Sequence, residues 1–344
     1  MGRFIYYLYY SFFMVYVFKK VVGNKSYYYL RASLRKGSRV ISKDIAYLGS
    51  NVAEAKKTLS KLPKFKKEID KAYRKINFVL ESNHFLEKVK EKKLKVDPFL
   101  GKNIFLVEAC ALHFNKVFNK LDPLTKKEIF NNFIIEFAFN TTSIEGNTID
   151  LREARELLEE GLTPKNKTLR EIYDLQNTKK VFETLDFKKE ISHTLIKKIH
   201  ADLMENIDMR NEYRARDVII TKSTFKSTPF HLVKSDLDLL LKWYTENKTK
   251  LHPFVLAVIF HHKFEKIHPF MDGNGRTGRM LMNFILMKNK YPPVIIQKKN
   301  RSNFLDALHL ADEVFVTETK KEKYLELVNF MVAELNETYW NNFL

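Results

Sequence analysis

The chain has little of what loop-rich and disulfide-bonded proteins are built from. Its 344 residues include ten glycines, nine prolines and one cysteine, Cys110. Because turn-forming residues are so few, the apolar-periodic segments run long, which favours a mainly helical fold. One cysteine cannot close an intramolecular disulfide, so we expect Cys110 to fill a core and the protein to be cytoplasmic, in a reducing environment.

Acidic residues are scarce at the start of the chain. The formal net charge is +19, of which residues 1–100 carry +15 and residues 101–344 carry +4. This basic segment could bind nucleic acid or an acidic protein surface. The alternative is a solvated, lysine-rich helical face, which would need no partner.

A membrane-spanning segment is not expected. The uncharged run 4–18 is shorter than the about 20 residues that a spanning helix needs, and no small-residue cleavage site follows it. From Met14 onward the pattern is typical of strands separated by turns, so Met14 could be the biological start and residues 1–13 an upstream extension. The expected strands are 15–20, 26–34 and 40–48.

The second of these strands interleaves aromatic and basic side chains. They are Tyr27, Tyr28, Tyr29 and Arg31. Contact with nucleic acid would explain this composition, and so would packing within a small sheet.

The pattern divides the chain into three expected parts. They are a basic, β-rich segment over 1–50, a lysine-rich helical linker over 51–102 and a helical domain over 103–344. In the linker, Asn51 and Glu54 are typical of a helix start, and a second helix begins at Phe65. In the domain, the expected helices are 103–120, 124–146, 151–161, 167–186, 191–206, 234–248, 252–266, 276–290, 301–313 and 320–340. A β-hairpin is expected over 217–220 and 225–232.

Residues 268–279 read HPFMDGNGRTGR and lie between two helical patterns. The turn from Asp272 to Gly275 would direct backbone N–H groups toward one point at the start of the next helix. Such a turn, reinforced by the helix dipole, binds anions and phosphate above all. Arg276 and Arg279 are three residues apart and share one helix face, where guanidinium groups can bind phosphate oxygens in bidentate fashion.

Two more side chains in this stretch suit nucleotide chemistry. Asp272 offers a hard oxygen ligand for Mg²⁺, which would bridge phosphates already held by the turn. His268 has an imidazole that titrates near neutrality and could act as a base. Together these residues predict a site where a hydroxyl attacks a phosphorus atom of a nucleotide.

The stretch HPFMDGNGRTGR resembles the signature motif of Fic-domain proteins at every position of that motif. Fic-domain proteins mostly transfer AMP from ATP to Ser, Thr or Tyr hydroxyls of target proteins. The resemblance covers most of 105–335 and implies a helical bundle with a β-hairpin flap. It also implies His268 as the base and Asp272 as the Mg²⁺ ligand. The residues implied to bind the nucleotide are Gly273, Asn274, Gly275, Arg276 and Arg279.

The segment NEYRARDVII, residues 211–220, resembles the entry to the Fic flap, although Glu212 stands where a glycine is common. The flap of the family docks the target by backbone pairing, in the manner of strand addition. The residues that the resemblance places there are Phe225, Lys226, Ser227 and Thr228.

The sequence TTSIEGN, residues 141–147, resembles the Fic inhibitory motif. The matching positions are Thr141, Glu145 and Gly146, and their place ahead of the catalytic motif is similar to the class with an N-terminal inhibitory helix, here 124–146. A glutamate that pairs with Arg279 would remove this arginine from the γ-phosphate and lower turnover. The alternative is that Glu145 is an ordinary polar residue at a helix end.

Several alternatives stay open at the level of sequence. The same fold could transfer UMP or phosphocholine, whereas phosphate-transferring relatives of the Doc type carry a lysine where Gly273 stands. Glu145 could also orient water to remove AMP from a modified target. A regulator that binds nucleic acid through residues 14–100 is the second class of function. ATP, a protein target and Mg²⁺ are the expected partners, with a homodimer left open and no membrane.

Overall fold

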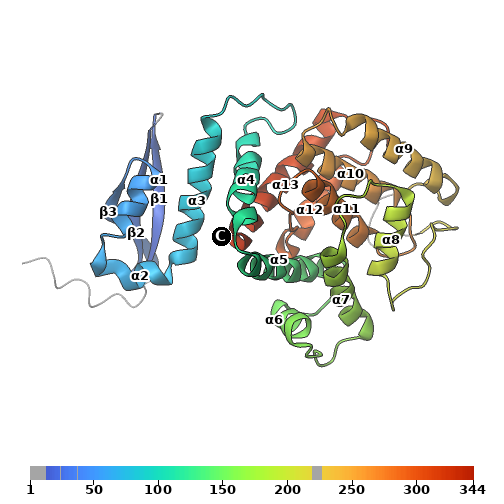
Figure 1. Cartoon of the computed structure of the whole chain (residues 1–344), viewed down its shortest axis with the longest axis horizontal. Coiled ribbons are helices and arrows are strands. Elements are labelled where there is room, and N and C mark those ends of the chain that lie inside the picture. Colours follow the sequence, from blue (N-terminus) through green and yellow to red (C-terminus); the bar gives the residue numbers. More distant parts are fainter. Residues whose placement is uncertain (1–12, 24, 37, 219–226) are drawn as a thin grey trace, which may run out of the picture. The chain divides into compact units, whose positions relative to one another are not determined.

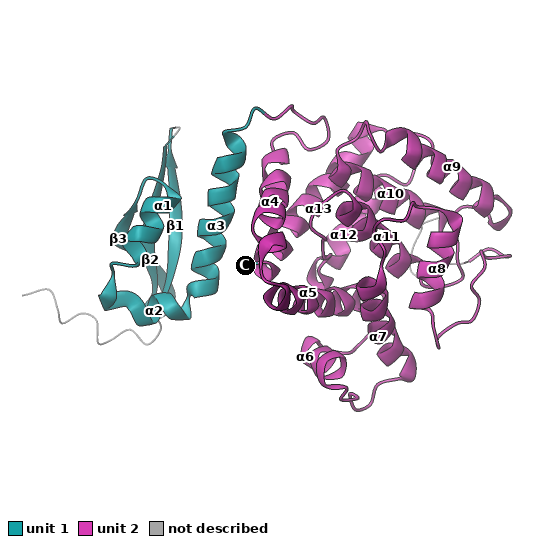
Figure 2. Cartoon of the chain, viewed as in Figure 1, with its two compact units in different colours: residues 1–93, 344 teal, residues 94–343 magenta. Residues whose placement is uncertain are grey.

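The computed structural model describes residues 13–23, 25–36, 38–218 and 227–344. The chain forms two compact units, one of residues 1–93 and 344 and the other of residues 94–343 (Figure 2). The first combines a small sheet with helices, and the second is built around helices (Figure 1). The predicted mainly helical fold with a small N-terminal sheet is confirmed.

The first unit contains the three expected strands, paired antiparallel in the order β1-β2-β3. Their bounds are β1 (Phe13–Val22), β2 (Lys25–Lys36) and β3 (Arg39–Gly49). The helices that follow are α1 (Val52–Leu59), α2 (Lys66–Lys71) and α3 (Tyr73–Lys90). Asn51 caps α1 by accepting a hydrogen bond from the Glu54 amide at 2.9 Å. The helix expected to continue from Phe65 is instead broken at Ala72, between α2 and α3.

Alternation along the strands gives the sheet two different faces. One face packs on α1 and α3, and its buried side chains are Val15, Val17, Tyr28, Leu30, Ala32, Leu34 and Leu48. The opposite face carries Tyr16, Phe18, Tyr29, Arg31 and Tyr47 in two cross-strand rows, Tyr16–Arg31 and Phe18–Tyr29–Tyr47. Tyr28 therefore belongs to the core, although its neighbours Tyr27 and Tyr29 do not.

Part of the apolar run near the start, residues 4–12, lies outside the described residues. Its last residues form the first half of β1. Within the described ranges, no helix has the length and apolar character needed to cross a bilayer.

The second unit is built around two buried helices, α10 (Pro253–Ile267) and α11 (Asn274–Lys288). Every residue of α10 from Phe254 to Phe264 is buried. A helix that is apolar nearly all round is typical of the centre of a bundle. The surrounding helices are α4 (Ile104–Lys116), α5 (Pro123–Ile144), α6 (Leu151–Arg155), α7 (Leu169–Thr184), α8 (His193–Leu203), α9 (Val233–Asn247), α12 (Arg301–His309) and α13 (Lys321–Asn342).

Two local expectations differ from the structure. Helix α11 begins at Asn274, two residues before the expected start, because the turn ahead of it is tighter than the pattern suggests. The hairpin prediction falls partly on residues 219–226, outside the described part, and its second strand was expected to reach Leu232. Residues Phe230–Leu232 instead form a 3₁₀ turn after Pro229, which cannot donate to a strand ladder.

Candidate active site

The motif 268–279 lies where α10 ends and α11 begins. Helix α11 contacts α5 and α8, and α7 packs on both of these helices, so three helices lie close to the turn (Figure 1). His268 is the C-cap of α10 and adopts a left-handed backbone conformation, with φ of 52°. This conformation turns the chain sharply out of the helix.

Arg214 holds that turn in place. Its Nε donates to the carbonyl oxygen of His268 at 2.8 Å, and its own amide donates to the carbonyl oxygen of Pro269 at 2.9 Å. Its guanidinium also bonds to the carbonyl oxygen of Thr228, at the described end of the predicted flap. One buried arginine therefore joins the base, the turn and the flap.

The imidazole of His268 is largely buried. Burial lowers its pKa to about 4, although a hydrogen bond to the backbone of Glu265 acts in the opposite direction. The ring is therefore neutral at physiological pH, as a general base must be before it accepts a proton.

Asn274 braces the turn from within. Its Oδ1 accepts from the amide of Phe270 and its Nδ2 donates to the carbonyl of the same residue, both at 2.8 Å. The Asn274 side chain thus braces the turn, and the contact with phosphate that the resemblance implied stays a prediction. Phe270 is fixed in turn by stacking on His200, with ring centroids 3.6 Å apart.

Two glycines keep the turn compact. Gly273 has φ of 72°, and a Cβ there would lie 2.6 Å from Sδ of Met204. At Gly275 a Cβ would collide with Oε1 of Glu145. The carboxylate of Glu145 therefore occupies the space over the start of α11 where an anion would bind.

The carboxylate of Asp272 is bonded through both of its oxygens. Its Oδ1 accepts from the Gly273 amide at 2.7 Å, and its Oδ2 pairs with Arg170. Burial raises the pKa of Asp272, but the hydrogen bond and charge of Arg170 outweigh it, so the pKa is below its usual value.

No cluster of three or more metal-ligating side chains occurs in the part of the chain that the structure describes. Mg²⁺ in nucleotide sites commonly takes one or two carboxylates and completes its shell with phosphates and water. A lone aspartate beside an anion-binding turn fits that requirement. Asp272 is therefore the residue that would hold Mg²⁺.

Both arginines of the motif are buried and bonded to the end of α5. Arg279 donates from Nη2 to Glu145 Oε1 at 2.6 Å and from Nε to the hydroxyl of Thr141 at 2.6 Å. Arg276 donates from Nε to Glu145 Oε2 at 2.9 Å. Each oxygen of Glu145 thus holds one arginine, and the arginine at 276 also pairs with Asp174 of α7.

The chain turns away immediately after Glu145. Gly146 has φ of 109°, a conformation that side chains other than glycine rarely adopt. Asn147 then donates to the carbonyl oxygen of Glu171 at 2.9 Å, which ties the end of this turn to α7. The three residues of the TTSIEGN motif thus place a carboxylate between two arginines.

Only the end of the predicted flap is described. Phe225 and Lys226 lie outside the described residues. Ser227 and Thr228 line a cavity of about 400 Å³ together with Lys266 and Phe315. The amide of Thr228 donates to the carbonyl oxygen of Lys266 at 3.2 Å, so this end of the flap is attached to α10.

Sequence reasoning missed several residues that touch the site. They are Arg170, Asp174, His200 and Arg214. Each is a single polar residue, and it reaches the site only because the tertiary fold packs its helix or loop beside the motif. Arg170 and Asp174 did carry a weak signal, because opposite charges four residues apart mark one helix face.

Comparisons with known proteins agree with this geometry. The model of the Fic/DOC family matches residues 190–286. Protein adenylyltransferase fic-1 of Caenorhabditis elegans is 31% identical over 183 residues, which are 51% of this chain and 36% of that protein. Protein adenylyltransferase Fic of Drosophila erecta is 35% identical over 199 residues, 55% of this chain and 38% of that protein. The chain thus covers well under half the length of these relatives.

A solved structure gives the same result for the fold. A Fic domain containing signaling protein from Bacteroides thetaiotaomicron superposes with a TM-score of 0.62 and 25% identity, over 69% of this chain and 95% of that one. The family match ends inside α11 and contains the whole stretch from His268 to Arg279. Sequence and fold agree: residues 190–286 match the Fic/DOC family, and the chain shares the fold of that Fic domain containing protein.

Proposed function

We propose that the chain transfers AMP from ATP to a Ser, Thr or Tyr hydroxyl of a target protein. One observation carries this proposal: a neutral imidazole lies beside a turn in which a carboxylate already occupies an anion site between two arginines. Phosphate would bind there in place of the carboxylate. The two animal relatives, both protein adenylyltransferases, support the same reaction.

The chain's own residues divide the reaction between them. His268 takes the proton of the target hydroxyl while the hydroxyl oxygen bonds to the α-phosphorus. The bond from the α-phosphorus to the oxygen that bridges it to the β-phosphate breaks, and pyrophosphate leaves. Arg276 and Arg279 neutralise the departing phosphates, and the turn amides hold the α-phosphate. Bound to Asp272 and the phosphates, Mg²⁺ would supply further charge neutralisation.

Glu145 acts as a lock in this proposal. While its carboxylate holds both arginines, the β- and γ-phosphates lack their partners, and the α-phosphorus is not in line with the hydroxyl. The same carboxylate could orient water to remove AMP from a modified target. An AMP-modified target that stays intact with the wild-type chain would argue against removal.

The donor is tested by offering the Glu145→Gly chain equal concentrations of ATP, UTP and CDP-choline with Mg²⁺. We expect protein adducts with the mass of AMP in intact-mass spectra, because the animal relatives are adenylyltransferases, whereas Gly273 argues only against transfer of phosphate. Adducts with the mass of UMP, phosphocholine or phosphate would assign another reaction to the fold. Glu145→Gly/Arg279→Ala is the control, and it should give no adduct.

The face of the N-terminal sheet opposite to α1 and α3 favours a second function, the binding of single-stranded nucleic acid. The rings of Tyr29 and Tyr47 lie 5.4 Å apart, and the guanidinium of Arg31 lies 3.7 Å from the ring centroid of Phe18. Tyr47 is 52% exposed. Aromatic rings on a sheet can stack on bases while cations bind phosphates, and the basic charge of residues 1–100 is complementary to such a ligand.

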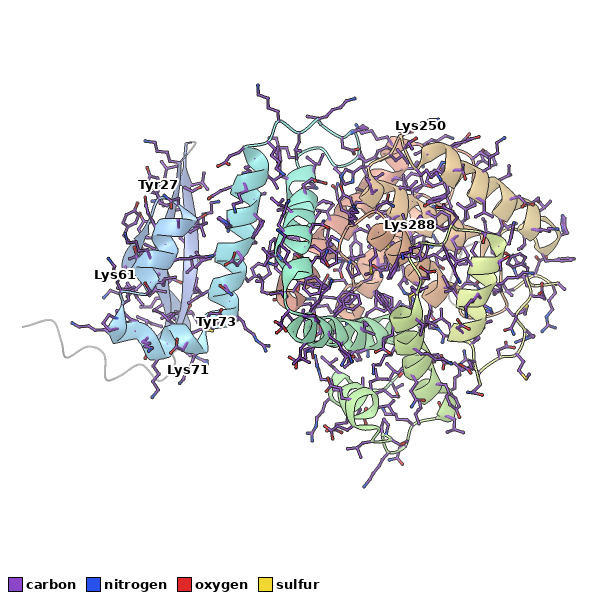
Figure 3. All side chains as sticks on the ribbon, in the orientation of Figure 1. Tyr27, Lys61, Lys71, Tyr73, Lys250 and Lys288 are labelled. Atoms are coloured by element: carbon purple, nitrogen blue, oxygen red, sulfur yellow. The ribbon has the colours of Figure 1, made fainter. Side chains whose placement is uncertain are left out.

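Removing one ring tests this face. We expect Tyr47→Ala to weaken binding of a fluorescein-labelled single-stranded DNA about tenfold, because a stacked base is worth roughly 1–3 kcal/mol. Fluorescence anisotropy at several salt concentrations measures it. Tyr73→Ala, which removes a 60% exposed tyrosine at the start of α3, is the matched control (Figure 3). Equal loss in both variants, preference for duplex, or no binding at low salt would contradict the assignment.

A further inference from the structure

Helix α7 presents two opposite charges to the phosphate-binding turn. Arg170 pairs with Asp272, and Asp174 pairs with Arg276. Arg170 and Asp174 are four residues apart on one face of α7, and they meet Asp272 in the turn and Arg276 in the first turn of α11. Along α7 the positive residue comes first, whereas along 272–276 the negative residue comes first. Each charge therefore lies opposite one of the other sign.

The two ion pairs differ in how easily they can open. The side chains of Arg276 and Asp174 are 2% and 13% exposed, and breaking such a buried pair leaves an uncompensated charge. The side chains of Arg170 and Asp272 are 55% and 35% exposed, and an exposed pair contributes little to stability. The side chain of Arg170 can therefore leave Asp272 while the pair of Arg276 and Asp174 stays closed.

The backbone around Arg170 is firmly held. The carboxylate of Glu171 accepts from the amide and the hydroxyl of Thr148, at 2.9 and 2.7 Å, and from the amide of Thr168 at 3.0 Å. These hydrogen bonds lower the pKa of Glu171 to about 2, so it stays charged. Release of Asp272 thus requires only a rotation of the Arg170 side chain, without movement of α7.

Arg170 covers the part of Asp272 that a cation would use. The turn itself already occupies Oδ1 through the Gly273 amide, whereas Oδ2 is bonded to the Arg170 guanidinium. A divalent cation at Oδ2 would compete with this guanidinium for the same oxygen. It would also be repelled by the positive charge.

We propose that Arg170 is a gate that competes with the divalent cation for Asp272. The proposal rests on the proposed function in one respect, the assignment of Asp272 as the residue that holds the metal. The gate keeps the cation from binding firmly before the nucleotide supplies phosphate oxygens. It acts on Asp272 and is distinct from the contact of Glu145 with the arginines.

The test measures Mn²⁺ binding by electron paramagnetic resonance in the full chain, first without nucleotide, where the gate acts, and then with a non-hydrolysable ATP analogue. We expect Arg170→Ala to bind Mn²⁺ about three- to tenfold more tightly, in the range expected when an exposed ion pair and a nearby positive charge are lost. Arg170→Lys should lie between Arg170→Ala and the wild type, and Asp272→Ala should lose tight binding. The matched control is Arg152→Ala, which removes an exposed arginine paired with Glu156.

The outcomes separate the gate from the reaction. Equal Mn²⁺ affinity in Arg170→Ala and the wild type would overturn the gate. Weaker binding in Arg170→Ala would also overturn it, because Arg170 would then support the bound nucleotide. Failure of the analogue to bind to either the wild type or Glu145→Gly would count against the proposed function, since the gate acts only on the cation.

Discussion

Glu145→Gly is expected to raise the rate of AMP transfer about 100-fold, because it removes the bias toward the locked state. A hundredfold gain is two factors of ten, each of which corresponds to about 1.4 kcal/mol of that bias. Its carboxylate bonds to Arg279 at 2.6 Å and to Arg276 at 2.9 Å. Without it the guanidinium of Arg279 can turn to the phosphates, while Arg276 keeps its pair with Asp174. Transfer of label from ATP labelled on the α-phosphate measures the rate.

Two further variants separate the lock from a general loosening of the site. Glu145→Gln keeps the shape but removes the charge, so it should activate the chain less than glycine does. Glu145→Gly/Arg279→Ala should lose the gain, because the freed arginine is the source of the activation. A wild-type rate in Glu145→Gly would remove the lock from the account.

His268→Ala is expected to lower transfer by about 10²–10⁴-fold, the usual contribution of a positioned general base. The variant is made in the Glu145→Gly chain, where activity is highest. ATP binding, followed by calorimetry, should stay close to its value before the substitution, because the imidazole acts on the hydroxyl. Since the pKa of His268 is about 4, the rate before substitution should not fall through protonation of this residue as pH decreases from 8 to 6.

The backbone at position 268 calls for a second variant. His268 has φ of 52°, a left-handed conformation that alanine disfavours and asparagine tolerates better. His268→Asn should therefore fold with a melting temperature closer to that of the unsubstituted chain and still be inactive. Activity that survives in the folded asparagine variant would assign the base to another residue.

The candidate catalytic stretch could be predicted because its residues lie within twelve consecutive positions. His268, Asp272 and Arg279 follow one another at fixed spacing between two helical patterns, and the local pattern alone brings them together. The contact of Glu145 with Arg279 joins residues 134 positions apart and was expected only because both belong to motifs with a known relation. Nothing in the spacing of the chain would otherwise have paired them.

The rest of the site depends on tertiary packing. Arg170 and Asp174 reach the turn because α7 packs beside α5 and α8, and no local pattern states which helices will be neighbours. Arg214 is one of many basic residues and is distinguished only by its burial. For Asn274 the structure adds a role that the pattern did not indicate, because its side chain holds the turn through the backbone of Phe270, while its place at the phosphate stays a prediction.

The central claim is that this site attaches AMP to protein hydroxyls with His268 as the base. The most direct measurement incubates the Glu145→Gly chain and host lysate with Mg²⁺ and ATP labelled on either the α- or the γ-phosphate. Compared with lysate incubated without the chain, additional labelled protein is expected from the α-label alone, and none is expected when His268→Asn is combined with Glu145→Gly. Additional label arriving from the γ-phosphate, or additional α-label persisting in the double variant, would contradict the claim.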